Sequence, residues 1–181
     1  MSYVFGEKQK DYLYACLSGQ MEVSVNLVFI GDVVSACGRD TLRNHIDTIK
    51  AINNIDVVIV NGENASHGRG LSMSSADELF DMGAEIITMG NHVWGNKDIF
   101  TLMQTNENII RPANLPSTSP GKGSVVYEKN GIKVGVINLL GRVYMEPCDC
   151  PFLEVDRQIE ELKKHTDIII VDFHAEATSE K

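Results

Sequence analysis

Side chains of the kinds that bind metal ions follow each of four short apolar runs in this sequence. The residues concerned are Asp32, Glu63, Asn64, Asn91 and His174. Carboxylate and amide oxygens together with an imidazole form a mixed, fairly hard ligand set, which suits Mn, Fe or Zn and differs from a thiolate site. If the fold brings these five side chains together, they predict a metal centre.

The four apolar runs are predicted to be strands. They are short, rich in β-branched residues and almost free of charge, as strands buried on both faces of a sheet are. They span residues 25–30, 55–60, 84–89 and 166–171. Helical patterns lie between several of them, and strands that alternate with helices favour an α/β domain with a mainly parallel sheet. Because ligands bind beyond the carboxyl ends of parallel strands, we expect the five side chains to share one rim.

The remaining elements complete an α/β fold class of layered, mixed β-sheets flanked by helices. Apolar residues recur with a helical period in residues 42–49, 73–80 and 152–162. Gly83 suits the C-terminus of the second of these helices. Asn130-Gly131, between the segments 124–129 and 132–139, is typical of a two-residue hairpin turn. We therefore expect antiparallel pairing around that hairpin.

Each candidate residue has a simpler explanation when it is taken alone. Asp32 could cap a helix that starts near Arg39, Glu63 and Asn64 could be turn residues, and Asn91 could be another turn or cap residue. A histidine after a buried strand, such as His174, is more often a hydrogen-bonded core residue than a ligand. The coincidence of all these residues at strand ends favours the metal centre.

Composition indicates one ordinary globular domain. The 181 residues are 43% hydrophobic and 23% charged, with a formal charge of -9. Residues 1–24 are interpreted as an N-terminal extension and residues 25–181 as the domain. The extension has charges where a signal peptide would be apolar, and no apolar run approaches the roughly 20 residues that span a bilayer, so we expect a cytoplasmic protein. The acidic charge argues against a broad nucleic-acid-binding face but not against a small phosphate substrate, because a bound metal can reverse the local charge.

The cysteines and arginines give weaker signals. The four cysteines, which match no zinc or thioredoxin spacing, are Cys16, Cys37, Cys148 and Cys150. Cys148 and Cys150 are too close in sequence for an easy disulfide, and reduced, partly buried thiols are the simplest interpretation. Three arginines could contact a substrate phosphate, although solvent-exposed surface residues are the simpler explanation for them: Arg69, Arg111 and Arg142.

Several longer motifs make the interpretation more specific. GDVV, NGEN, GRGL, ITMGNHVW, RPAN, PGKG, INLLGRV and VDFHAEATSEK, in this order, resemble the successive motifs of YmdB-like metallophosphoesterases. Gly90-Asn91-His92 alone is the signature of the wider calcineurin-like superfamily, and NGEN with DFHAEATSEK narrows the resemblance to this branch. Val34 stands where most of the superfamily has a histidine, and Glu63 stands where it has an aspartate. Both departures are typical of the YmdB-like branch.

The resemblance implies a calcineurin-like fold with two divalent metal ions, Fe or Mn first and Zn or Mg as alternatives. The implied ligands are Asp32, Glu63, Asn64, Asn91 and His174. Glu63 would bridge the two ions, because a carboxylate has two oxygens to share. His92, next to a ligand but not a ligand itself, would act as the general acid that protonates the departing ribose oxygen.

The activity implied by the resemblance is hydrolysis of 2′,3′- or 3′,5′-cyclic nucleotides by a phosphoric diester hydrolase. The family continues past SEK with a Gly-Thr-His-Thr-His motif that completes its metal centres, whereas this sequence stops at Lys181. We therefore expect a domain that is incomplete at its C-terminus, with either an unpaired edge at strand 168–172 or one bare sheet face. Such a surface predicts low solubility, self-association into a homo-oligomer, or dependence on a partner that supplies the missing segment. The alternative is a catalytically impaired fragment that acts as a structural or regulatory binding module.

Overall fold

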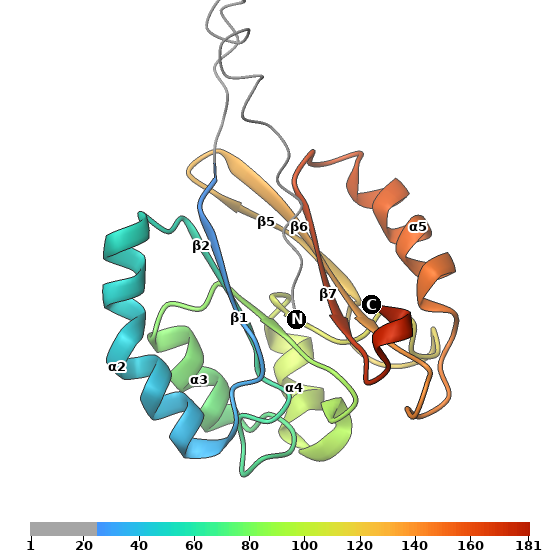
Figure 1. The fold of residues 1–181 in the computed structure, drawn as a ribbon, viewed down its shortest axis with the longest axis horizontal. Helices are drawn as coiled ribbons and strands as arrows, with labels where there is room; N and C mark the ends of the chain where they lie inside the picture. The colour runs from blue at the N-terminus through green and yellow to red at the C-terminus, as the bar shows by residue number, and fades with distance from the viewer. Residues whose placement is uncertain (1–24) are drawn as a thin grey trace, which may run out of the picture.

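The computed structural model describes residues 25–181, which form two β-sheets with helices on their outer faces (Figure 1). The N-terminal extension predicted at residues 1–24, including Cys16, lies outside the described residues. Among the helices of the described part, none is long and apolar enough to cross a membrane.

The first sheet has four parallel strands in sequential order. They are β1 (Leu27–Ile30), β2 (Val57–Asn61), β3 (Ile86–Thr88) and β4 (Ile109–Ile110). The helices that connect them are α2 (Ser35–Asn53), α3 (Met73–Asp81), the short 3-10 helix η1 (Val93–Gly95) and α4 (Asp98–Thr105). Leu42 and Ile46 of α2 pack in one buried cluster with Val58 and Val60 of β2, so these helices cover one face of the sheet.

The second sheet has three strands in the order β5-β6-β7. They are β5 (Ser124–Lys129), β6 (Ile132–Leu140) and β7 (Ile169–His174), with β5 antiparallel and β7 parallel to β6. Helix α5 (Pro151–Leu162) connects β6 to β7 and packs on the outer face through Leu162, and the 3-10 helix η2 (Thr178–Glu180) follows β7. Val134 and Val136 of the inner face pack against Val57 and Ile59 of the first sheet.

Local sequence signals explain where several elements begin and end. The Ser72 side chain accepts a hydrogen bond from the Ser75 N–H and caps the N-terminus of α3. Gly83, just beyond α3, has φ +92, a left-handed value that favours glycine. Asn130 and Gly131 both have positive φ, as the predicted hairpin turn requires. The hairpin, the mixed sheets and the flanking helices are therefore confirmed.

Two expectations about the strands and helices were wrong. The fourth predicted strand does not join the other three, because β7 pairs with β6 in the second sheet. Helix α2 begins at Ser35 rather than near Arg39, and its N-cap residue is Val34, which makes no side-chain cap hydrogen bond. Asp32 therefore does not cap this helix, and the simpler explanation for that residue is wrong.

Candidate metal centre

Glu63 lies at the junction of the two sheets, just beyond β2, and its side chain is fully buried. The backbone N–H of His92 donates a hydrogen bond to Glu63 Oε2 over 3.1 Å. His174, at the end of β7, places Nδ1 2.6 Å from Glu63 Oε1. Strand ends from both sheets therefore meet at one buried carboxylate.

The contact between His174 and Glu63 is an ion pair when the imidazole is protonated. Apart from this contact, Glu63 Oε1 is a buried acceptor without a hydrogen-bond donor among the described residues. The Glu63 carboxylate raises the pKa of His174 above its ordinary value, and partial burial of the imidazole opposes this effect. A buried carboxylate oxygen whose only polar neighbour is an imidazole nitrogen fits a bound cation, because a cation can bind both atoms.

Asp32, Asn64 and His92 form a chain of contacts beside Glu63. The Asn64 Nδ2 group donates to Asp32 Oδ1 over 2.7 Å, and Asn64 Oδ1 lies 2.6 Å from His92 Nδ1. Asp32 has φ +48, an uncommon value for aspartate that aims its side chain from the end of β1 toward the loop after β2. The amide oxygen of Asn64 is therefore engaged with His92, and Asn64 would have to exchange this contact for a metal bond.

Asn91 lies half-buried between Gly90 and His92, at the end of β3. Within residues 25–181, its side chain has no hydrogen-bond partner, so its amide oxygen can accept a new contact. Gly90 leaves no room for a side chain, because a β-carbon there would overlap the carboxylate of Glu63. The loop after β3 therefore packs its backbone directly against the buried carboxylate.

A buried polar network that the sequence patterns did not reveal lies below Glu63. Asp172 accepts hydrogen bonds from Asn138 Nδ2 over 3.1 Å and from Asn61 Nδ2 over 3.5 Å. Burial raises the pKa of Asp172, and the hydrogen bonds that it accepts oppose the increase. The signal that could have revealed this network was Asn138, a polar residue within the apolar run of β6.

The donor set is partial in the described part of the chain. No group of three His, Cys, Asp or Glu side chains is close enough there to hold a metal ion by itself. Glu63 and His174 meet directly, whereas Asp32 approaches them through Asn64. The amide oxygens of Asn64 and Asn91 would have to complete a metal site made from these residues.

The three arginines have different positions. Arg111 is buried, which corrects the expectation of a solvent-exposed side chain. Its guanidinium donates to the backbone carbonyls of Pro112, Ser119 and Pro120, so it organises the loop after β4. Arg69 and Arg142 are exposed, as expected.

Comparisons with known proteins agree with the motif analysis. The family model described as "YmdB-like protein" matches residues 28–181. A 2′,3′-cyclic-nucleotide 2′-phosphodiesterase of Bacillus subtilis (strain 168) is 46% identical over 157 residues, which cover 87% of this chain and 60% of that protein. The chain therefore spans about 60% of the length of this curated relative.

Solved structures give the same result for the fold. The crystal structure of a novel phosphatase from Mycoplasma pneumoniae has a TM-score of 0.80 and 38% identity, covering 88% of this chain and 58% of that one. A 5′-nucleotidase precursor from Thermus thermophilus has a TM-score of 0.60 and 15% identity, covering 83% of this chain and 37% of that one. The more distant likeness concerns the fold alone, and the expected calcineurin-like α/β fold class is confirmed.

Proposed function

The chain belongs to the YmdB-like protein family, and from this premise we propose that it serves metal-dependent hydrolysis of small phosphodiesters. The observation that carries the proposal is the buried Glu63 carboxylate, whose Oε1 lies 2.6 Å from His174 Nδ1 and has no other polar partner among the described residues. Burying a carboxylate is costly, and ionisable groups in such perturbed surroundings cluster at functional sites.

We propose that the centre takes two divalent metal ions. Fe or Mn suits the mixed oxygen and nitrogen donors best, with Zn or Mg as alternatives. The residues that would hold them are Asp32, Glu63, Asn64, Asn91 and His174. When bound, such a pair of ions polarises the phosphate and supplies a hydroxide nucleophile at neutral pH. Glu63 would contribute to both ions, since it offers two carboxylate oxygens at the junction of the sheets.

His92 is the proposed general acid. Its Nδ1 atom lies 2.6 Å from Asn64 Oδ1, and a donor at Nδ1 is the arrangement that satisfies an amide oxygen. In the imidazolium form that a general acid requires, Nε2 also carries a proton, and this proton would pass to the departing ribose oxygen. The one-third exposure of the His92 side chain leaves the imidazole accessible to a substrate.

The proposed substrates are cyclic nucleotides. The name of the Bacillus subtilis relative favours the 2′,3′-cyclic class, with 3′,5′-cyclic nucleotides as the alternative. The partial donor set favours a second candidate function, in which this chain is a catalytically impaired structural or regulatory module. A cytoplasmic location remains a prediction from the sequence alone.

One experiment separates these candidates. Metal content after purification and turnover of 2′,3′- and 3′,5′-cyclic AMP would be measured for the wild type and for His92→Ala. We expect the variant to keep its metal and to lose rate by about 10²–10⁴-fold, the usual contribution of general acid–base catalysis. His165→Ala, an exposed histidine beyond α5, is the matched control and should change neither quantity.

The other outcomes of this experiment have distinct meanings. Loss of metal from His92→Ala would make His92 a ligand instead of the acid. A wild-type chain that binds neither metal nor cyclic nucleotide would contradict the phosphodiesterase proposal. A chain that binds metal but does not turn over either substrate would support the structural or regulatory module.

A further inference from the structure

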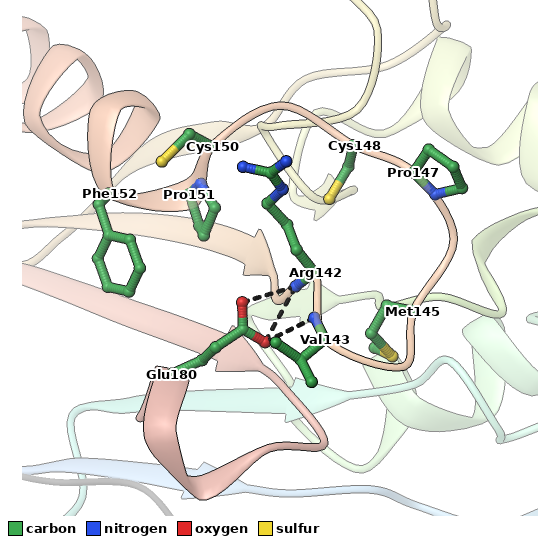
Figure 2. Close-up of a pocket in the computed structure, with 9 residues that line it drawn as sticks. All are labelled: Arg142, Val143, Met145, Pro147, Cys148, Cys150, Pro151, Phe152 and Glu180. Carbon is green, nitrogen blue, oxygen red and sulfur yellow. Dashed lines mark hydrogen bonds between the residues drawn. The ribbon is translucent and has the colours of Figure 1, made fainter.

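A cavity of about 510 Å³ opens beside the N-terminus of α5, and none of its lining residues belongs to the candidate metal centre. The loop between β6 and α5 forms one wall, and η2 forms another. Figure 2 shows Cys148, Cys150 and the guanidinium of Arg142 together on one side of this cavity. Phe152 and Met145 add apolar surface to its walls.

Cys150 occupies the N-cap position of α5, and Pro151 is the first residue of that helix. No side-chain cap hydrogen bond of normal geometry is formed. The N–H dipoles of Leu153 and Phe152 nevertheless favour a negative charge on the sulfur, and they are the main reason that the pKa of Cys150 is lowered. Cys148 is the opposite case, because burial raises the pKa of its thiol. The two neighbouring thiols therefore differ in the fraction that is present as thiolate near neutral pH.

The backbone of Arg142 is hydrogen-bonded, whereas its guanidinium group is exposed. Glu180 accepts hydrogen bonds from the backbone N–H groups of Arg142 and Val143, over 2.9 to 3.0 Å. These bonds occupy the Glu180 carboxylate, and within residues 25–181 no carboxylate forms a salt bridge with the Arg142 guanidinium. Figure 2 shows that guanidinium reaching between the two cysteines. The cavity thus presents an exposed positive charge next to a sulfur.

We propose that Cys150 is a modification site that forms a mixed disulfide with a small disulfide carrying a carboxylate. The Cys150 thiolate attacks one sulfur of the small molecule, and a new S–S bond forms at Cys150. The original S–S bond breaks, and the other half of the molecule leaves as a thiolate. Arg142 pairs with the carboxylate of the transferred half, and the cavity accommodates its apolar part.

The test uses the full chain with Cys16 and Cys37 both replaced by serine, so that Cys148 and Cys150 are its only thiols. Dithiobis(nitrobenzoate), which carries two carboxylates, and the uncharged dithiodipyridine are the two probes. Absorbance reports the thiolate that each probe releases. We expect one equivalent of thiolate to be released rapidly at neutral pH, about threefold to tenfold faster than the second equivalent. This rapid equivalent should remain after Cys148→Ser and disappear after Cys150→Ser.

Arg142→Met distinguishes the role of the guanidinium. We expect the variant to slow the reaction with dithiobis(nitrobenzoate) about threefold to tenfold more than the reaction with dithiodipyridine, because only the first probe has carboxylates. Circular dichroism of each variant confirms that it is folded. A rapid equivalent that persists in Cys150→Ser, or equal slowing of both probes by Arg142→Met, would overturn the proposal. The assay requires no metal and no phosphodiesterase turnover, so it does not depend on the proposed function.

Discussion

Gly90 and Glu63 are packed so closely that a methyl group at position 90 would overlap both carboxylate oxygens of Glu63. The three atoms nearest to this methyl group all belong to the Glu63 carboxyl group, which is central to the candidate metal centre. Any larger residue at position 90 must displace the carboxylate or the backbone of the loop that carries Asn91 and His92.

Gly90→Ala is expected to weaken metal binding by about 10–100-fold, the range seen when the groups that position metal ligands are changed. The measurement is metal content and affinity by titration into chelator-treated protein. Gly31→Ala is the matched control next to Asp32, because its β-carbon would meet only Phe29 at an ordinary 4.0 Å. Equal affinity in Gly90→Ala and wild type would show that the position of Glu63 does not matter.

Glu63→Gln is expected to stabilise the metal-free chain, since it removes a negative charge from a fully buried side chain. The gain should be about 1–3 kcal/mol in the presence of a chelator. With Mn²⁺ added, the wild type should become more stable than Glu63→Gln, because the metal stabilises only the chain that binds it. Thermal unfolding under both conditions is the measurement, and Glu107→Gln at an exposed ion pair is the control. Destabilisation in chelator would mean that the pairing with His174 outweighs the cost of burial.

Glu78 gives a pH-dependent prediction for the contact between α2 and α3. Its carboxylate accepts hydrogen bonds from Arg39 over 2.9 Å and from Arg43 over 2.8 Å, and these bonds lower the pKa of Glu78. The ionised carboxylate therefore adds stability at pH values above 4.5, the ordinary pKa of this group. This stability is lost as the pH falls through the lowered pKa. Urea unfolding of wild type and Glu78→Gln should differ at neutral pH and converge in acid. A difference that is independent of pH would exclude an electrostatic origin.

Val171 provides a test of the predicted homo-oligomer. It is 40% exposed on β7, which in the described part of the chain pairs only with β6 and has an open edge. Lysine on such an edge strand discourages pairing with another chain. Val171→Lys is therefore expected to reduce self-association, measured by light scattering after size-exclusion chromatography. Tyr144→Lys, at a 90% exposed loop residue, controls for the added charge. A wild-type monomer would contradict the prediction of an oligomer.

The sequence predicted the parts of this molecule that depend on local patterns. The apolar runs, the Asn130-Gly131 turn and the left-handed Gly83 are each determined within a few residues, and all three are found. Glu63 and His174, which the sequence predicted to lie on one rim, are in contact, although β7 pairs in the second sheet and not in the first. Both sheets direct strand ends to the same junction, so the error about pairing did not alter the location of the site.

The features that escaped prediction depend on contacts between distant segments. The hydrogen bond from Asn61 to Asp172 joins two sheets, and nothing within either strand indicates its partner. Arginine is usually a surface residue, but the loop of Pro112 to Pro120 folds around Arg111 and supplies the carbonyl groups that accept its hydrogen bonds. Such positions follow from the whole topology and not from the spacing of residues.

The distance along the chain between the two halves of the site has a consequence for its assembly during synthesis. Asn61 and Asp172 are 111 residues apart, and Glu63 and His174 meet beside them. A ribosome that adds about 5–20 residues per second needs roughly 6–20 s to cover that interval. Until then, the first sheet has its carboxylate in place but no imidazole opposite to it. A metal ion shared by Glu63 and His174 can therefore be acquired only after β7 has emerged and paired with β6.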